Sequence, residues 1–241
     1  MRYSTNFTIL SHDTGHNGEV HPSALCRYLQ EAADSQMRHD GPTYRELIDN
    51  GYSFLLNHLH VKWHHSLRAY DNVTVQTWAY DPPRGASFER YYALHRDDTL
   101  IAEAASVWAL MDLGTMQLCR VGTVPLHYGT DEPLPLSTRL RLPSVEFETA
   151  GTHTVRYADV DVNNHMNNTR YADMLCNFIP DIDRVRITDL QIHYLAEAPL
   201  DSVLTIRRAF TEEDGHPTAW FETVREDGTY NVRARVDLQY L

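Results

Sequence analysis

The chain has 241 residues, of which 42% are hydrophobic and 22% are charged, the balance of an ordinary globular protein. Its net charge of −12 and its lack of a basic run argue against binding to nucleic acid or to an anionic membrane surface. No apolar run approaches the ~18 residues of a membrane span, so no membrane insertion is expected. Cys26, Cys119 and Cys176 are odd in number and widely separated, which favours reduced thiols and a cytoplasmic location.

The first half of the chain predicts a strand, two helices and then four strands. The first helix starts at about Pro22, which suits a first helical turn, and it places Leu25, Leu29 and Ala32 on one face. Turn signals such as DPPRG separate the later strands. The predicted elements are a strand at 2–10, helices at 22–37 and 43–51, and strands at 53–63, 72–80, 87–96 and 99–111.

The second half repeats this order. It predicts a strand at 153–158, a helix at 167–179, and strands at 186–195, 202–210, 218–226 and 229–241. LHVKW (59–63) aligns with LQIHY (190–194), and DDTLIAEA (97–104) aligns with DGTYNVRA (227–234). The loop before each main helix also matches, so that Asp13, Asn17 and Glu19 correspond to Asp159, Asn163 and His165. The halves differ mainly by the extra helix at about 41–50.

One helix followed by an antiparallel meander predicts an α+β fold, in which the apolar helix face packs on a curved sheet. Two such units in tandem can cover each other's sheet edges. The Pro-rich stretch from Val124 to Ser144 predicts a linker across the surface. We therefore expect an N-terminal domain over 1–123, a linker over 124–144 and a C-terminal domain over 145–241.

The run DVNNH is the first candidate for chemistry. Asp161, Asn163 and His165 alternate just before a predicted helix, and in an extended loop alternate side chains point the same way. The alternative is that Asp161 or Asn163 caps the helix and His165 is an ordinary loop residue. The helix start also offers N–H groups near Met166 to Asn168 that could stabilise an oxyanion.

Glu197 is the best candidate for a catalytic carboxylate. It follows a strand-like run and is flanked by alanines, and burial there would raise its pKa to a value suited to a base. The alternative is a solvated carboxylate in a turn. The equivalent residue of the first half is Ser66, so the fold does not require a carboxylate at this position.

Other chemistry finds little support in the sequence. Histidines cluster loosely in two strand-like runs, but no cysteine or carboxylate pair stands at ligand spacing beside them, so we expect no metal site; they are His60, His64, His65 and His193. There is no GxSxG elbow and no Walker loop. Cys176 lies in an apolar helical stretch, which indicates core packing rather than a nucleophile.

Three segments resemble one known family. DVDVNNHMNNTRYADML (159–175) resembles the DLDxNxHVNNxxY segment of the acyl-acyl-carrier-protein (acyl-ACP) thioesterases of plant plastids and bacteria. QIHYLAEA (191–198) is similar to that family's strand ending in Tyr-x-x-Glu. ASVWALMD (105–112) is similar to its first-half strand rich in Ser-x-Trp. The resemblance covers essentially the whole chain and is strongest over 155–198.

The resemblance implies a tandem (double) hotdog fold and hydrolysis of fatty acyl-ACP to free fatty acid and acyl carrier protein (ACP), which ends chain elongation. It places catalytic roles on Asp161, Asn163, His165 and Glu197, and it implies no metal and no organic cofactor. Many plant members have a cysteine directly after the glutamate, where this chain has Ala198. A cysteine mechanism is therefore excluded at that site. The lack of a plastid transit peptide points to a bacterial cytoplasmic member.

In the preferred mechanism Glu197 and His165 activate a water, and His165 protonates the leaving thiolate. Asn163 positions the water or the carbonyl, and Asp161 orients Asn163 or His165, although direct attack by a carboxylate stays open. The alternative functions are an acyl-CoA thioesterase of the same fold and a non-catalytic acyl-binding module.

The first-half helix is expected to line the acyl pocket through Leu25 and Leu29 and to set chain-length preference. Acyl chain length and branching, and assembly into a homodimer, stay open.

Overall fold

The computed structural model describes residues 1–80, 86–120, 122–213 and 215–241. The predicted DPPRG turn (81–85) lies outside these residues. Within them the order of elements is β1 (Tyr3–Thr8), α1 (Pro22–Asp40), α2 (Tyr44–Asp49), β2 (Tyr52–Trp63), β3 (Asn72–Ala79), β4 (Ser87–Arg96), β5 (Thr99–Asp112), β6 (Gln117–Leu118), β7 (Glu148–Thr154), α3 (Arg170–Cys176), β8 (Val185–Tyr194), β9 (Val203–Glu213), β10 (His216–Arg225) and β11 (Tyr230–Tyr240). The predicted α+β class is confirmed.

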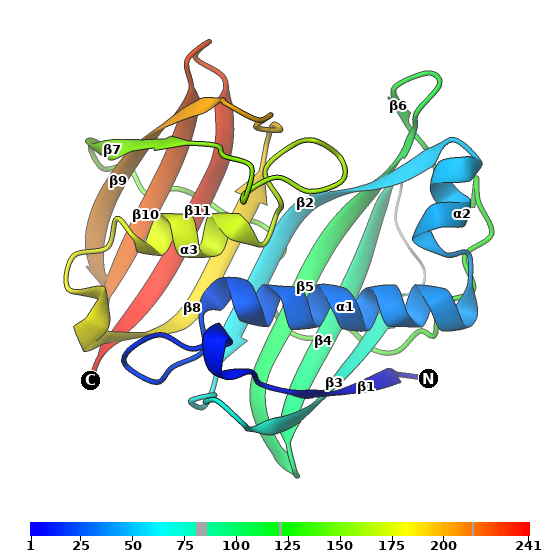
Figure 1. The fold of residues 1–241 in the computed structure, drawn as a ribbon, viewed down its shortest axis with the longest axis horizontal. Helices are drawn as coiled ribbons and strands as arrows, with labels where there is room; N and C mark the ends of the chain where they lie inside the picture. Colours follow the sequence, from blue (N-terminus) through cyan, green and yellow to red (C-terminus); the bar gives the residue numbers. More distant parts are fainter. Residues whose placement is uncertain (81–85, 121, 214) are drawn as a thin grey trace.

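The strands form one antiparallel sheet, and α1 and α3 both lie across the same face of it (Figure 1). The strand order is β1-β3-β4-β5-β2-β8-β11-β10-β9-β7, with β6 paired to β5. Read outwards from the centre, each half has the same order: β2, β5, β4, β3, β1 on one side and β8, β11, β10, β9, β7 on the other. Two helix-on-sheet units of the hotdog type therefore share a continuous sheet.

The pairing of β2 with β8 at the centre supports the internal repeat. The alignment of 59–63 with 190–194 makes Gln191 the equivalent of His60, and these two residues face each other across the two strands. The flanking pairs are His58 with His193 and Lys62 with Asp189. Under the same alignment each of these pairs is the symmetric copy of the other. The two halves are therefore related by a local twofold axis close to His60.

Local sequence explains where α1 and α2 end and begin. Gly41 follows α1 with φ of 68°, and its N–H donates to the Met37 carbonyl, as a glycine C-cap does. Thr43 then caps α2 in a capping box, in which its side chain accepts from Glu46 N–H and Glu46 bonds back to Thr43. These caps turn the chain sharply between the two helices and bring Tyr44 over the end of α1.

The second-half helix is shorter than the predicted 167–179. Asn167 delays its start, because the Asn167 side-chain oxygen accepts from both the N–H and the hydroxyl of Thr169. At its far end the N–H groups of Phe178 and Ile179 donate three residues back, to Leu175 and Cys176, so the chain leaves α-helical geometry before Pro180. The helix therefore runs only from Arg170 to Cys176.

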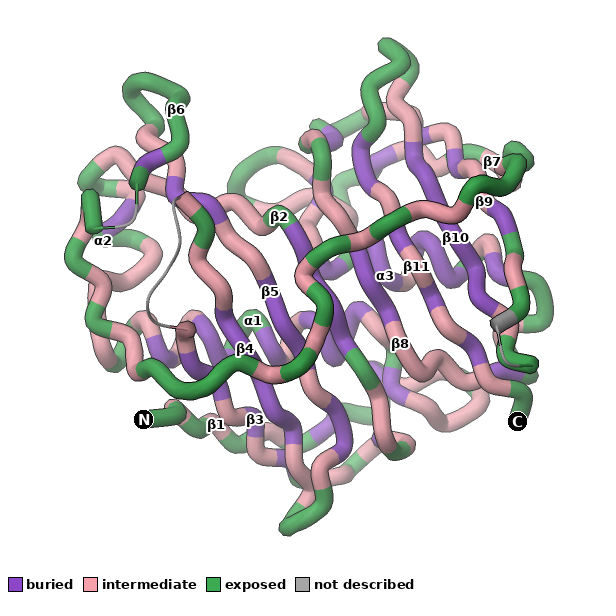
Figure 2. The backbone as a smooth tube through the Cα atoms, turned by 180° about the vertical axis from the view of Figure 1, so that it is seen from behind, coloured by how far each residue is buried: buried purple, intermediate pink, exposed green. Residues whose placement is uncertain are grey.

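The segment between the halves crosses the sheet face opposite the helices (Figure 2). Trp78 Nε1 donates to the Glu132 carbonyl at 2.8 Å, and His60 Nδ1 lies 2.9 Å from the Ser137 carbonyl. Leu134 and Leu136 pack against a small cluster that includes buried Trp78. The part from Glu132 to Ser137 thus follows the predicted surface path, whereas Tyr128, near the start of the stretch, lies on the helix side, where its hydroxyl donates to the Pro42 carbonyl.

None of the helices in the described part of the chain combines the length and hydrophobicity needed to span a lipid bilayer. The main core lies between the helices and the sheet and joins both halves, with Leu25 and Leu29 of α1 beside Ala172 and Leu175 of α3.

Candidate active site

A cavity of about 1420 Å³ lies between α1 and the first-half sheet. Apolar and aromatic side chains such as Phe54, Phe88 and Trp108 line it from the sheet, and Ala33 and Met37 line it from α1. Residues 161–163, 165–168, 171 and 194–197 of the second half also line it. A large apolar cavity with a few polar groups at one end is the usual form of a small-molecule site.

The DVNNH run forms a tight turn rather than the extended loop expected from sequence. Asp161 N–H donates to the His165 carbonyl at 3.1 Å, Asn164 N–H donates to the Asp161 carbonyl at 3.0 Å, and Asn164 has φ of 62°. Even so, Asp161, Asn163 and His165 all line the cavity, together with Glu197. The turn thus gathers the four predicted residues, by a different route from strand alternation.

Asp161 holds this turn together. One of its carboxylate oxygens accepts from Asn163 N–H at 2.9 Å, and the other accepts from Asn167 Nδ2 at 3.2 Å. Carboxylates commonly stabilise turns in this way, two residues along the backbone. Asp161 therefore fixes the backbone of Asn163 rather than its side chain.

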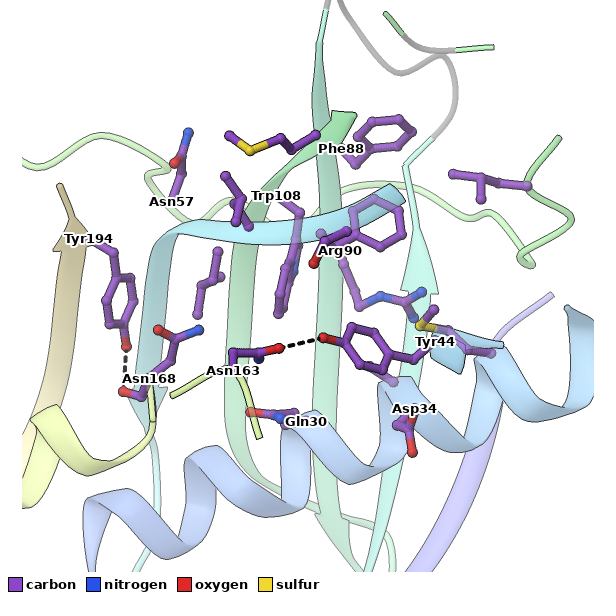
Figure 3. Close-up of a pocket in the computed structure, with 18 of the residues that line it drawn as sticks. Gln30, Asp34, Tyr44, Asn57, Phe88, Arg90, Trp108, Asn163, Asn168 and Tyr194 are labelled. Atoms are coloured by element: carbon purple, nitrogen blue, oxygen red, sulfur yellow. Dashed lines mark hydrogen bonds between the residues drawn. The ribbon is translucent and has the colours of Figure 1, made fainter. Parts of the chain in front are cut away.

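Asn163 is oriented from the other half of the chain. Its side-chain oxygen accepts a hydrogen bond from the Tyr44 hydroxyl of α2 at 3.0 Å (Figure 3). Since the oxygen is engaged, the amide nitrogen is the atom left to donate into the cavity. No acceptor for that nitrogen exists among the described residues. The arrangement suits a donor to a carbonyl oxygen or an oxyanion.

His165 and Glu197 form a loose pair at the exposed end of the cavity. His165 Nε2 lies 3.7 Å from a Glu197 carboxylate oxygen, and His165 Nδ1 lies 3.3 Å from the Met166 carbonyl. The Glu197 side chain is 63% exposed, so of the two alternatives left open by the sequence, a buried and a solvated carboxylate, the structure has the solvated one. The distance is longer than a hydrogen bond, but catalytic pairs often tighten only when substrate binds.

The first-half loop has the same backbone but different side chains. Its bridge between Thr14 and Val20 matches that between Val160 and Met166. Val20 N–H donates to the Leu67 carbonyl as Met166 N–H donates to the Ala198 carbonyl, so Ser66 occupies the position of Glu197.

At the other site positions the first-half loop has Gly15 for Asp161, Asn17 for Asn163 and Glu19 for His165. The Asn17 side-chain oxygen accepts from Glu19 N–H, which closes a local turn. Of the four site residues this half thus keeps only the asparagine.

Leu25 and Leu29 were predicted to line the acyl pocket, and this prediction is wrong. Both side chains are buried in the core and do not line the cavity. They lie on the α1 face that packs against the sheet and α3. The neighbouring α1 face, spaced at three and four residues, reaches the cavity instead, through Gln30, Ala33, Asp34 and Met37. Helix α1 therefore packs one face into the core and lines the cavity with the adjacent face.

The structure also does not bear out the oxyanion site that was expected at the start of the second-half helix. The N–H groups of Met166 and Asn167 already donate to the carbonyls of Ala198 and Asp159, both at 2.8 Å. The helix itself begins only at Arg170. Of the three predicted groups, only the Asn168 N–H has no acceptor within the described part of the chain.

The three cysteines, and the four histidines considered above for a metal site, do not line the cavity. Cys26, Cys119 and Cys176 are all buried, and burial raises the pKa of the Cys26 thiol to about 12 and that of Cys176 still further. His60 is held between the Ser137 carbonyl and Asp189.

Two cavity residues escaped the sequence reading. Tyr44 lies on α2, which only the first half of the chain has. This inserted helix was the sequence feature that could have pointed to a cavity residue there. Arg90 stands in the apolar strand run of β4, where the sequence gives no sign that its side chain faces a cavity.

Comparison with known proteins gives a consistent result. A model of the acyl-ACP thioesterase N-terminal domain matches residues 1–123, and one of the C-terminal domain matches residues 144–240. The chain is 24% identical over 229 residues to the chloroplastic palmitoyl-acyl carrier protein thioesterase of Arabidopsis thaliana, covering 87% of this chain and 55% of that protein. A Cuphea hookeriana protein of the same name is 22% identical, over 98% of this chain and 61% of its own length. The chain spans just over half the length of such relatives.

Solved structures share the fold. An acyl-ACP thioesterase from Bacteroides thetaiotaomicron superposes with a TM-score of 0.88 at 23% identity, over 98% of this chain and 97% of its own. The 12:0-ACP thioesterase from Umbellularia californica gives a TM-score of 0.79 at 20% identity, over 100% of this chain and 94% of its own. Since the two domain models together match nearly all of the sequence, the chain belongs to the acyl-ACP thioesterase family.

Proposed function

We propose that this protein hydrolyses fatty acyl-ACP thioesters to free fatty acid and ACP, and so ends fatty acid chain elongation. The observation that carries the proposal is the meeting of Asn163, His165 and Glu197 at the polar end of a large apolar cavity. The cavity can take an acyl chain, and the polar end leaves the thioester within reach of a donor, an imidazole and a carboxylate.

In the proposed mechanism a water attacks the thioester carbonyl. His165, paired with Glu197, takes one proton from that water, and the Asn163 amide nitrogen donates to the carbonyl oxygen as it becomes negative. The tetrahedral intermediate then collapses, the carbon–sulfur bond breaks, and His165 returns the proton to the leaving thiolate. Atoms of the water end in the carboxylic acid and in the thiol.

Direct attack by Asp161 is less favoured than water attack. Both of its carboxylate oxygens are engaged by donors of the same turn, on Asn163 and Asn167. A nucleophile that must leave those donors would lose the turn that holds Asn163. We therefore assign Asp161 a positioning role, acting through the backbone of Asn163.

The remaining features of the proposal follow from this site. The partner is an acyl carrier protein with a phosphopantetheine-linked chain, and the chemistry needs neither metal nor organic cofactor. The domains run over 1–123 and 145–241 with 124–144 as the linker, and the same order of strands in each half supports this division. Buried free thiols fit the reducing cytoplasm that we propose as its location. A homodimer stays a prediction.

The test is a hydrolysis panel of acyl-ACP substrates of graded length beside matched acyl-CoAs. We expect release of free acid from acyl-ACP, with a clear drop in kcat/KM when CoA replaces the carrier. A preference for CoA would favour the acyl-CoA thioesterase alternative. Tight acyl binding without turnover of any thioester would favour the binding module and contradict the proposal.

A further inference from the structure

Within the described part of the chain, one arginine or lysine lines the acyl cavity, on the sheet side. Arg90 of β4 is only 7% exposed and faces the same cavity as Tyr44 and Asn163 (Figure 3). Its strand is separated from β2 by β5, and adjacent strands lie about 4.8 Å apart. Strand β4 therefore lies about 10 Å across the sheet from β2 and about 14 Å from β8, the strand that leads to Glu197.

The hydrogen bonds of Arg90 use only one end of its guanidinium. Nη1 donates to Gln36 Oε1 at 2.5 Å and to Thr77 Oγ1 at 3.1 Å, and the central carbon lies 5.2 Å from the centre of the Tyr128 ring. No acceptor for the N–H groups of Nε and Nη2 exists among the described residues. A guanidinium can only donate, so these groups need an acceptor from elsewhere.

Several partly buried arginines of the sheet have carboxylate partners, whereas Arg90, like Arg186, which donates to Gln239 Oε1, has none in the described part of the chain. Arg207 and Arg233 flank Glu222 at 3.1 and 3.2 Å, and Arg96 contacts Asp71 at 2.7 Å.

The carboxylates closest to Arg90 in the sequence and along α1 are engaged elsewhere. Glu89 accepts from the Tyr91 hydroxyl, and Asp40 accepts from the amide of Gln36. Donors of a buried charge that water can still reach become unfavourable when an acyl chain displaces that water, unless the chain itself offers an acceptor.

The fold does not require an arginine here. The register of β4 with β5 shifts between Leu94 and His95, and that of β10 with β11 shifts at the equivalent place, between Thr223 and Val224. Counting back from these shifts puts Ala219 in the position of Arg90. Ala219 is fully buried, so the second half fills the position with a small apolar side chain.

We propose that Arg90 forms a distal subsite for an oxygen atom on the acyl chain, a hydroxyl, oxo or carboxylate oxygen near the end far from the thioester. This inference rests on the proposed function, because it names the acyl class that the same cavity takes. A purely hydrocarbon chain would leave the Nε and Nη2 donors unsatisfied, whereas a terminal oxygen would accept from them.

The experiment measures kcat/KM for ACP thioesters from hexanoyl to dodecanoyl, each in a plain, an ω-hydroxy and an ω-carboxy form. At the length that brings the oxygen to Arg90 we expect about a tenfold preference for an oxygenated chain, the usual scale of a hydrogen bond to a charged group. In Arg90→Met the preference should vanish. Arg90→Lys, which keeps the charge with fewer donors, should retain part of it. Arg186→Met, a matched change at an arginine that does not line the cavity, should keep the preference.

Binding separates this inference from the proposed function. Amide analogues of the acyl-pantetheines, with nitrogen in place of sulfur, are not hydrolysed, so calorimetry with the plain and ω-hydroxy analogues tests Arg90 even if no thioester is turned over. Tighter binding of the hydroxy analogue in wild type, lost in folded Arg90→Met, supports the subsite. Equal binding of the two analogues at every length, or an unchanged ratio in folded Arg90→Met and Arg90→Lys, overturns it.

Discussion

The hydrogen bond from Tyr44 to Asn163 gives a prediction that depends on both halves of the chain. Tyr44→Phe removes the hydroxyl that fixes the Asn163 side-chain oxygen at 3.0 Å. A neutral hydrogen bond contributes about 1 kcal/mol, which corresponds to about a fivefold change in rate. Without this bond the amide can turn its oxygen towards the substrate carbonyl. We therefore expect kcat to fall about fivefold while KM changes little.

A double-mutant cycle makes this prediction specific. If Tyr44 acts only through Asn163, Tyr44→Phe should have almost no further effect in an Asn163→Ala background. Initial rates of free acid release from acyl-ACP supply the four values, with Tyr240→Phe as a control at an exposed tyrosine. Additive losses in the cycle, or an unchanged rate in folded Tyr44→Phe, would refute the positioning role.

Four further predictions concern the site, the cavity, the thiols and the core. Asn163→Ala should lower kcat/KM by at least ~100-fold, whereas Asn17→Ala in the equivalent first-half loop should stay within a few fold; similar losses in both would place chemistry in both halves. Ala33→Leu narrows the cavity from α1 and should shift the preferred acyl chain to a shorter length, and an unchanged length profile would show that this face does not bind the chain. Iodoacetamide should leave turnover intact, because the cysteines are buried and burial raises the pKa of the Cys176 thiol far above its usual range; rapid inactivation with one labelled cysteine would contradict this. Burial, with the nearby charge of His193, lowers the pKa of His58 from 6.5 to about 4. As the pH falls, the unfolded chain therefore takes up this proton at a higher pH than the folded chain. The contribution of His58 to the free energy of unfolding should be complete above pH 6.5 and decrease as the pH falls towards 4. Urea titrations at pH 7.5 and 5 should show that the free energy of unfolding drops by about 2 kcal/mol more in wild type than in His58→Gln. Equal drops in the two proteins would contradict this role of His58.

The order of elements and the internal repeat were predictable because they rest on short-range patterns. Alternating apolar residues marked β2 and β8, and the matched segments 59–63 and 190–194 proved to be the two strands that meet at the centre of the sheet. The match between the loops at Asn17 and Asn163 was also sound, since both have the same backbone bonds. Such features depend on residues close together in the chain.

The wall of the cavity was not predictable in the same way. An apolar face at Leu25 and Leu29 marks burial, but the sequence cannot say whether the neighbour is core or ligand. The structure puts both leucines in the core and gives the cavity to the adjacent stripe at Ala33 and Met37. The sequence could not decide between a buried and a solvated Glu197 for a related reason, since flanking alanines do not report how open a cavity end is.

Contacts between the halves were beyond the sequence altogether. Tyr44 and Asn163 are 119 positions apart, and Arg90 meets Gln36 across 54. Neither pair belongs to a motif, and both depend on how α1, α2 and the second-half turn are placed over one sheet. Side-chain chemistry could nominate the four site residues, but only the three-dimensional arrangement adds the groups that orient them.

The central claim is that the second-half turn hydrolyses an acyl-ACP held in the first-half cavity. The most direct measurement is free fatty acid release from an acyl-ACP panel by the wild-type chain and by His165→Ala, each checked for folding by circular dichroism. The account predicts turnover by wild type and a loss of at least ~100-fold in kcat/KM in the variant. No free acid from any acyl-ACP with wild type, or wild-type rates in folded His165→Ala, would contradict it.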